Sequence, residues 1–277
     1  MSHAPVPLAG VIGHPIAHSK SPRLHAHWLR RYNAPGHYIP MDVAPDHLAE
    51  VIRTLPKAGF VGVNVTIPHK EKILEIADLI TDRATLIGAA NTLIFRKDGK
   101  IHADNTDGYG FVENIRQKAP DWTPKAGPAA VFGAGGAARA VVAALLDVGV
   151  PEIMISNRTR IRAEQLQRDF GKRITVVDWV QAGNMLDEAR TVVNTSSLGM
   201  VGQPELRVPL DGLRQDALVT DLVYTPLQTR LLRTATEMGC TTVDGLGMLL
   251  HQAVPGFERW FGTRPEVDDD LRAAVLR

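Results

Sequence analysis

Residues 129–139, A-A-V-F-G-A-G-G-A-A-R, decide the fold of this chain. Four apolar residues lead into the pattern G-x-G-x-x-A, and a second apolar segment follows from Val141 to Leu146. This order predicts a buried strand that turns tightly into a helix. Another apolar run, Ile153 to Ile155, comes where the next parallel strand would begin. A glycine motif alone is a weak signal, but in this context it predicts a Rossmann-type dinucleotide-binding unit.

The glycines of this motif have a physical task in such a unit. Gly133 makes the tight turn, and Gly135 lets backbone N–H groups approach a pyrophosphate closely. The N-terminus of the following helix favours the negative charge of the phosphates. The loop expected to bind the cofactor consists of Gly133, Ala134, Gly135, Gly136 and Ala137.

The end of the second strand predicts which dinucleotide binds. An NAD site usually carries Asp or Glu there, which hydrogen-bonds the ribose 2′-hydroxyl. This chain instead has S-N-R-T-R-I-R at residues 156–162, and a guanidinium can bind a 2′-phosphate through paired hydrogen bonds. The dipole of a helix disfavours arginines at its start, so three of them need another reason. We expect Arg158 to bind the 2′-phosphate of NADP, with Arg160 and Arg162 as candidate helpers.

Strand and helix patterns alternate in the part of the chain before the glycine motif. Strands are expected at residues 8–13, 37–42 and 60–63, and helices at 22–32, from 45 and from about 70. The last of these helices would bury Ile73, Ile76, Leu79 and Ile80 on one face. Residues 92–95 and 100–102, which Asp98-Gly99 separates, are predicted to form a hairpin.

Two more strands are expected beyond the glycine motif, at residues 191–196 and 217–224. Each ends in a polar turn, as do parallel strands whose carboxyl ends face a bound nucleotide. The alternation along the whole chain predicts an α/β protein with a largely parallel sheet.

Composition and charge exclude several classes of protein. The formal net charge of the 277 residues is +1, whereas non-specific nucleic-acid binding needs a strongly basic face. The most apolar region, residues 137–150, contains Arg139 and Asp147 and is too short to span a membrane. The single cysteine, Cys240, excludes an internal disulfide, fits a small buried side chain and suits a reducing compartment. The first ten residues lack the features of a signal peptide, so we expect a cytoplasmic protein.

A second informative stretch, N-V-T-I-P-H-K at residues 64–70, follows the strand expected at 60–63. Taken alone, it predicts a turn in which Pro68 ends the strand and a solvated helix begins. Four other motifs accompany it: S-K-S-P at 19–22, A-A-N-T at 89–92, D-N-T-D-G at 104–108, and D-G-L-G-M-L at 244–249 with Gln252 close behind. In order and spacing, over essentially the whole chain, these motifs resemble those of the shikimate dehydrogenase family.

This resemblance implies the reversible NADPH-dependent reduction of 3-dehydroshikimate to shikimate, a step of chorismate and aromatic amino-acid biosynthesis. It also implies a two-domain α/β architecture. The N-terminal α/β catalytic domain, residues 1–105, would be completed by C-terminal helices in residues 245–277. A Rossmann NADP-binding domain with a parallel sheet would occupy residues 106–244.

The resemblance makes Lys70 the catalytic residue and Asp107 its partner. The reaction needs hydride transfer at one ring carbon and proton exchange at the oxygen on that carbon. A lysine ammonium can polarise the ketone and donate the proton, and the neutral amine can accept it in the reverse direction. Asp107 would orient Lys70 and bind a neighbouring hydroxyl, and it is also placed to cap a helix at 108–116. The sequence leaves open the protonation state of Lys70 and the identity of the ultimate proton donor.

The same resemblance assigns the remaining site residues. Ser19 and Ser21 would bind the substrate carboxylate, with help from Tyr224, although two serines before Pro22 also suit helix capping. The ring hydroxyls would be bound by Asn64, Thr66, Asn91 and Gln252. The further cofactor-binding residues would be Asn157, Thr159, Leu222, Gly245 and Met248. No spacing of histidines resembles a zinc site, so we expect no metal and interpret His14, His18 and His69 as packing or surface residues.

Two other functions compete with this one. A quinate or dual quinate/shikimate dehydrogenase that uses NAD is disfavoured by Ser19 and by the lack of an acidic residue after the second Rossmann strand. A non-catalytic NADP-binding protein would be expected to have lost Lys70 or Asp107, and both are present. The expected partner is the small-molecule substrate alone, and both a monomer and a homodimer fit the sequence.

Overall fold

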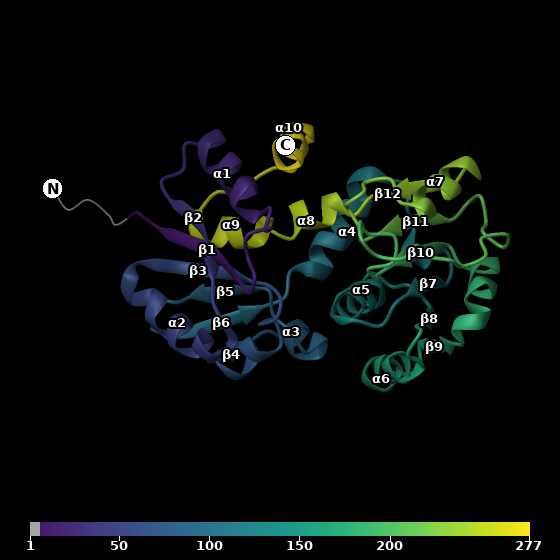
Figure 1. The fold of residues 1–277 in the computed structure, drawn as a ribbon, viewed down its shortest axis with the longest axis horizontal. Coiled ribbons are helices and arrows are strands. Elements are labelled where there is room, and N and C mark those ends of the chain that lie inside the picture. Colours follow the sequence, from purple (N-terminus) through teal and green to yellow (C-terminus); the bar gives the residue numbers. More distant parts are fainter. Residues whose placement is uncertain (1–5) are drawn as a thin grey trace. The chain divides into compact units, whose positions relative to one another are not determined.

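The computed structural model describes residues 6–277 and divides the chain into two compact units (Figure 1). The first unit comprises the chain up to Thr106 together with Leu250–Arg277, and the second is Asp107–Leu249. Residues 245–249, which the resemblance assigns to the catalytic domain, pack with the second unit. The first ten residues, which are not expected to form a signal peptide, include residues 1–5, and these five lie outside the described part of the chain. Among the described residues, no helix is long and apolar enough to cross a membrane.

The first unit is built on a six-stranded mixed sheet with the order β2-β1-β3-β5-β6-β4. β1 is parallel to β2 and β3, whereas β5 is antiparallel to both β3 and β6, which confirms the predicted hairpin. The strands are β1 Leu8–Gly13, β2 His37–Asp42, β3 Phe60–Val65, β4 Leu79–Ile80, β5 Thr92–Phe95 and β6 Ile101–Asp104. The helices are α1 Ser21–Arg31, α2 Leu48–Thr54, α3 Asp82–Ile87, α9 Val254–Phe261 and α10 Asp269–Leu276.

The helix expected from about Lys70 does not form. The structure has only a short 3₁₀ segment at Lys72–Glu75, and Leu79–Ile80 form strand β4 at the sheet edge. The backbone N–H of Asp78 donates to the carbonyl of Ile101, and the Asp78 carboxylate accepts the N–H of Ile101 in return. Pairing with β6 therefore overrides the helical spacing of the apolar residues.

A C-terminal helix completes the core of the first unit. Trp260 of α9 is buried, and its indole N–H donates to the carbonyl of Leu93 at 3.1 Å. A Cβ at Gly62 of β3 would lie 2.1 Å from the Trp260 Nε1 atom, so only glycine lets the indole lie against this strand. Helix α9 therefore packs directly against this sheet.

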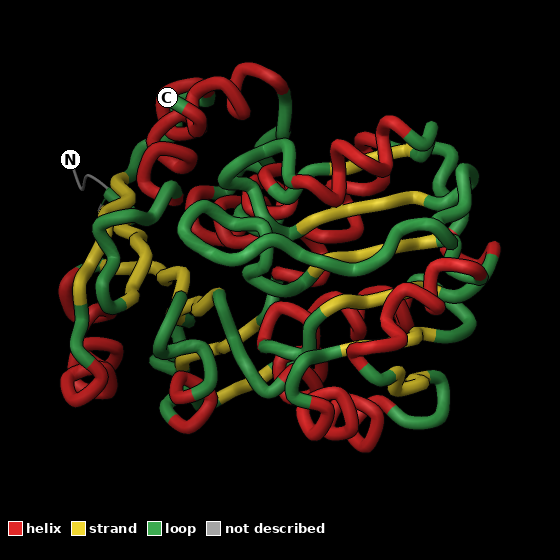
Figure 2. Tube along the Cα trace, turned by 45° about the vertical axis from the view of Figure 1, so that its right-hand side comes forward, coloured by secondary structure: helices red, strands yellow, loops and turns green. Residues whose placement is uncertain are grey.

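The second unit is a six-stranded parallel sheet with the order β12-β11-β10-β7-β8-β9. Counted from β7, this is the strand order of a Rossmann fold, with the reversal between β7 and β10. The strands, yellow in Figure 2, are β7 Ala129–Phe132, β8 Ile153–Ser156, β9 Ile174–Val177, β10 Thr191–Asn194, β11 Leu218–Asp221 and β12 Thr241–Val243. The helices are α4 Asp107–Lys118, α5 Gly136–Asp147, α6 Arg160–Phe170, α7 Arg230–Glu237 and α8 Leu246–His251, and α8 contains the second boundary.

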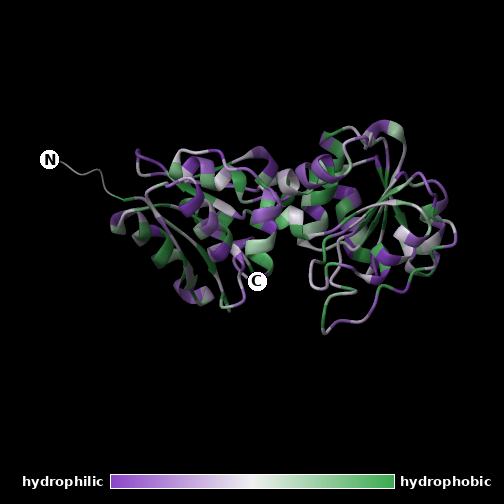
Figure 3. Cartoon of the chain, turned by 90° about the horizontal axis from the view of Figure 1, so that it is seen from above, coloured by the Kyte–Doolittle hydropathy of each residue, from purple (hydrophilic) through white to green (hydrophobic). Residues whose placement is uncertain are grey.

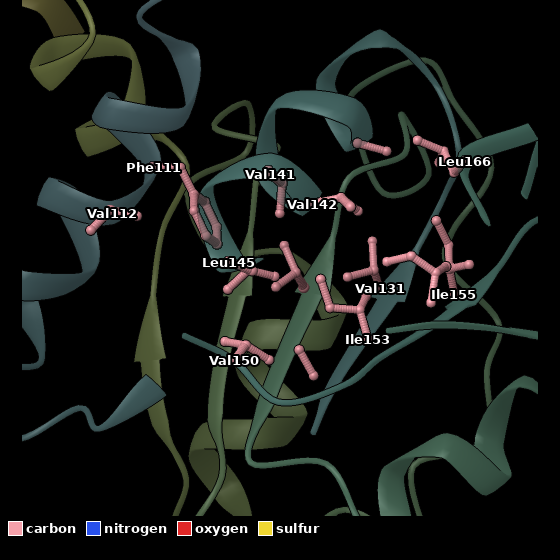
Figure 4. Packing of buried hydrophobic residues seen from close by; sticks show 14 of the residues in the cluster. Phe111, Val112, Val131, Val141, Val142, Leu145, Val150, Ile153, Ile155 and Leu166 are labelled. Atoms are coloured by element: carbon pink, nitrogen blue, oxygen red, sulfur yellow. The ribbon is translucent and has the colours of Figure 1, made fainter. Parts of the chain in front are cut away.

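The core of this unit explains why the glycine-motif region decides the fold. Side chains of Val141 and Leu145 on α5 point toward those of Val131 and Ile153 on the sheet (Figure 4), and all four are fully buried. The strands of this unit carry hydrophobic residues, whereas the surrounding helices mix hydrophobic and hydrophilic ones (Figure 3). Parallel strands covered on both faces need such continuous apolar runs.

A buried carboxylate joins the carboxyl ends of two neighbouring strands of this sheet. Asp221 ends β11 and accepts hydrogen bonds from the Asn194 amide at 2.9 Å, the Val223 N–H at 3.0 Å and the Thr229 hydroxyl at 2.8 Å. Thr229 is the N-cap of α7, so the carboxylate also fixes the start of that helix. Burial raises the pKa of Asp221 to about 6, because it outweighs the opposing hydrogen bonds.

This pKa predicts a pH-dependent stability. Because the folded-state pKa lies above the ordinary value of 3.8, the contribution of Asp221 is greatest below about pH 4 and falls as the pH rises through about 6. The rise of the pKa from 3.8 to about 6 corresponds to roughly 3 kcal/mol in the free energy of unfolding. Asp221→Asn removes this titration, so the unfolding temperature of wild type relative to the variant should fall between pH 4.5 and pH 7. Calorimetry at several pH values measures it.

Asp211→Asn, which removes an exposed carboxylate of the same unit, is the control for the loss of one negative charge. A constant difference between wild type and Asp221→Asn across this range would show that Asp221 does not titrate as described.

Candidate active site

A directional chain of hydrogen bonds connects three amide side chains of the first unit. The Tyr38 hydroxyl donates to Asn64 Oδ1 at 2.7 Å, and Asn64 Nδ2 donates to Thr92 Oγ1 at 3.2 Å. The Thr92 hydroxyl donates to Asn91 Oδ1 at 2.9 Å, and Asn91 Nδ2 donates to Gln252 Oε1 at 3.2 Å. The structure therefore brings together three amides that the sequence assigns to ring hydroxyls.

Backbone groups fix the orientation of two of these amides. Asn64 Nδ2 faces the carbonyl of Asn91 at 3.1 Å, and a carbonyl can only accept. The backbone N–H of Thr106 points at Asn91 Oδ1 at 2.9 Å, and an N–H can only donate. The backbone of Gln252 is held as well, because its main-chain carbonyl accepts a hydrogen bond from the Thr106 hydroxyl at 2.8 Å. The donors and acceptors in this region are therefore set before any ligand arrives.

The hydrogen bonds that Asn64 already makes limit which donors and acceptors it can offer a ligand. Both of its amide hydrogens are used, one by the Asn91 carbonyl and one by Thr92. Its oxygen accepts from Tyr38 and keeps one lone pair. Asn64 is 5% exposed, so it can meet a ligand only as an acceptor, at this one position.

Three members of this hydrogen-bond network were not predicted from the sequence. Thr92 and Thr106 lie inside the motifs A-A-N-T and D-N-T-D-G, so their positions carried a signal that was not interpreted. Tyr38 carried none, because its partner Asn64 is 26 residues away and only the sheet brings the two together.

The two serines near the start of α1 do not cap this helix. The N-cap residue is Lys20, which makes no side-chain cap, and Ser19 Oγ accepts the N–H of Ser21 at 3.3 Å. Ser21 is buried, whereas Ser19 and Thr66 are half-buried. Neither serine is therefore the N-cap residue of α1, and the Ser19 hydroxyl, which accepts this bond, keeps its hydrogen for a ligand.

Lys70 lies half-buried just after β3, and Asp107 is the first residue of α4 rather than a residue before it. His69, beside Lys70, is buried and hydrogen-bonds the carbonyl of Val43 at 2.7 Å through Nε2, which confirms it as a packing residue. His14, an exposed surface residue, contacts Asp42 at 2.5 Å. In the described part of the chain, no group of His, Cys, Asp and Glu side chains could hold a metal ion.

The glycine loop of the second unit has the geometry of a phosphate-binding turn. Gly133 has φ +110°, and a Cβ there would lie 2.8 Å from Thr195 Oγ1. At Gly135 and Gly136, both exposed, nothing lies within 4 Å of the position that a Cβ would take. Helix α5 begins here without a side-chain cap, so its first N–H groups can meet an anion. The loop fits the pyrophosphate of a dinucleotide.

The segment after β8 separates its arginines into two kinds. Arg160 pairs with Glu164 and Asp178. Arg158 and Arg162 are exposed, and within residues 6–277 neither guanidinium has a hydrogen-bond or ion-pair partner. Arg160 is thus a weaker candidate helper than Arg162, because two carboxylates already pair with it.

Other predicted cofactor residues lie in the same unit, some of them with structural tasks. Asn157 Oδ1 accepts the N–H of Ala134 at 3.2 Å and so ties the glycine loop to the segment before α6. Thr159 is the N-cap of α6 but makes no cap hydrogen bond. Gly245 lies against Leu222, because a Cβ at Gly245 would come within 2.3 Å of the Leu222 carbonyl.

Two further predicted residues of the second unit are partly buried. Met248, on α8, packs against the core of the unit. Tyr224 follows β11, and burial raises the pKa of its phenol. Its hydroxyl therefore stays protonated at neutral pH.

Comparison with known proteins connects these features. Family models match residues 11–93 (shikimate dehydrogenase substrate binding domain), 116–204 (shikimate / quinate 5-dehydrogenase) and 245–275 (shikimate 5′-dehydrogenase C-terminal domain). The shikimate dehydrogenase (NADP(+)) of Cereibacter sphaeroides is 70% identical over 274 residues, which cover 99% of this chain and 98% of that protein.

Solved structures agree in fold. The shikimate 5-dehydrogenase of Thermus thermophilus, in complex with NADP(H) and shikimate, is 36% identical with a TM-score of 0.86 and covers 98% of each chain. The quinate dehydrogenase of Corynebacterium glutamicum, in complex with NAD, is 29% identical with a TM-score of 0.89 and covers 97% of this chain and 98% of that one. By its near-complete match to relatives about 70% identical, this chain belongs to the NADP-dependent shikimate dehydrogenase family.

Proposed function

We propose that the chain catalyses the reversible NADPH-dependent reduction of 3-dehydroshikimate to shikimate, a step of chorismate and aromatic amino-acid biosynthesis. The observation that carries this proposal is the oriented amide chain from Asn64 to Gln252. Amides fixed by backbone groups suit a small ring with several hydroxyls, because a preorganised polar site rejects ligands that leave its groups unpaired. The family membership of the chain supports the same reaction.

This proposal divides the site residues into those that bind the substrate and those that bind the cofactor. Asn64, Thr66, Asn91 and Gln252 bind the ring hydroxyls of the substrate, while Ser19, Ser21 and Tyr224 bind its carboxylate. The glycine loop, Asn157, Arg158, Thr159, Arg162, Leu222, Gly245 and Met248 bind NADPH. When bound, NADPH supplies the hydride.

Proton transfer falls to Lys70 in this proposal. Its ammonium group donates to the carbonyl oxygen of 3-dehydroshikimate as that oxygen gains negative charge, and in the reverse direction the amine accepts the hydroxyl proton. Asp107 holds Lys70 in position and accepts a hydrogen bond from a neighbouring hydroxyl. We place the enzyme in the cytoplasm, because its single cysteine suits a reducing compartment. The proposal is the same for a monomer and for a homodimer.

Lys70→Ala tests the catalytic assignment. The variant should fold and bind NADP as wild type does, but kcat for shikimate oxidation should fall about 10²- to 10⁴-fold, because general acid–base catalysis is lost. Absorbance at 340 nm follows the reaction. Lys72→Ala is the matched control, since Lys72 lies two residues away and pairs with Glu75 on the surface. If Lys70→Ala kept a tenth of the wild-type rate, Lys70 would not be the proton donor.

Arg158→Ala tests the assignment of the cofactor. Loss of a charge-assisted contact to the 2′-phosphate should weaken NADP binding roughly 10- to 100-fold and change NAD binding little. Fluorescence titration with both dinucleotides measures this. Arg160→Ala, on the same segment but with its charge already paired, should leave the preference for NADP intact. Equal weakening of NADP and NAD by Arg158→Ala would exclude Arg158 as the 2′-phosphate ligand.

A further inference from the structure

Tyr38 reaches Asn64 across the strand that separates them. The sheet order places β1 between β2, which carries Tyr38, and β3, which carries Asn64. Tyr38 pairs with Ala9 and Asn64 with Val11, so both side chains lie on the same face, because positions two apart along a strand share a face. The small Ala9 leaves room for the phenol ring, whose hydroxyl donates to Asn64 Oδ1 at 2.7 Å.

An aromatic cluster holds the ring of Tyr38 in place. The imidazole of His25, from α1, stacks on it with ring centroids 3.7 Å apart and an interplanar angle of 4°. Trp260 of α9 packs against both rings, at 5.9 Å from His25 and 6.2 Å from Tyr38. His25 is fully buried, and burial lowers its pKa to about 3, although nearby Asn64 opposes the shift. The stack is therefore between uncharged rings at neutral pH.

The hydroxyl of Tyr38 is a permanent donor. Burial raises the pKa of Tyr38 well above its ordinary value, and a hydrogen-bonding contact with Ser21 opposes the rise only in part. Asn64 Oδ1 can only accept, so the single phenolic hydrogen points at Asn64. Ser21 and Asn64, which the proposed function assigns to the carboxylate and to a ring hydroxyl, therefore both contact the same tyrosine.

We propose that Tyr38 is a positioning residue for substrate recognition, and that its hydroxyl holds Asn64 so that the remaining oxygen lone pair accepts a hydrogen bond from a substrate hydroxyl. This inference rests on the proposed function. Without the phenolic donor, only the two hydrogen bonds from Nδ2 hold the Asn64 amide, and the buried oxygen loses a partner. Tyr38 acts through Asn64 and does not itself touch the reacting atoms.

Tyr38→Phe removes the donor and keeps the aromatic stack. The KM and the calorimetric Kd for shikimate should rise about tenfold, as expected when one buried hydrogen bond is lost. The KM for NADP should stay within about twofold. Tyr32→Phe is the matched control, since it removes a phenol that accepts the N–H of Glu266 at 2.9 Å elsewhere in the same unit. That variant should bind shikimate as wild type does.

A double-mutant cycle separates positioning from a structural effect. In an Asn64→Ala background, Tyr38→Phe should change shikimate binding by less than about twofold, because the group through which it acts is gone. Asn64→Ser serves the same purpose if the alanine variant does not fold. Persistence of the tenfold effect in this background, or a change below twofold in Tyr38→Phe alone, would overturn the inference.

The two proposals fail in different ways in this experiment. If wild type binds shikimate but does not oxidise it with NADP, the proposed function fails, while the binding cycle still tests Tyr38. If wild type oxidises shikimate and Tyr38→Phe behaves as wild type, the role of Tyr38 alone fails. If wild type does not bind shikimate, both are wrong.

Discussion

The hydrogen bond from the Thr106 backbone N–H to Asn91 Oδ1 is the constraint on which the first unit depends most. It fixes one amide, and that amide orients its neighbours through Thr92 on one side and Gln252 on the other. The same contacts join the end of the chain to its N-terminal part, because Gln252 belongs to the C-terminal segment of this unit. The residues that complete the fold thus include those that we propose bind the substrate ring. Buried polar networks of this kind are stabilising only when every member is satisfied.

The second unit reaches its function by a different route. Its sheet is parallel and buried on both faces, so the polar groups gather where the strands end. There, some charged side chains have hydrogen-bond or ion-pair partners and others do not. Asp221 is fastened by three donors, and Arg160 is paired with carboxylates, whereas Arg158 is left without a partner among the described residues. An unpaired guanidinium beside an open glycine loop is well suited to a phosphorylated ribose.

The sequence predicted the Rossmann unit well, because strand, glycine turn and helix lie next to one another between residues 129 and 147 and their pattern is local. It failed at residues 70–80, where pairing with a distant strand replaced the expected helix. Among the site residues, those within short motifs could be named, but what orients them could not. The contact between Tyr38 and Asn64 depends on strand order, which no local pattern encodes.

Initial rates of shikimate and quinate oxidation, each with NADP and with NAD, test the central claim most directly. High activity with shikimate and NADP, and little with the other three pairings, is the predicted result. It would show that the oriented amides select the ring and that the open arginines select the 2′-phosphate. A preference for quinate or for NAD would contradict that account of the site while leaving the fold and the family intact. NADP binding without turnover in any pairing would contradict the catalytic role.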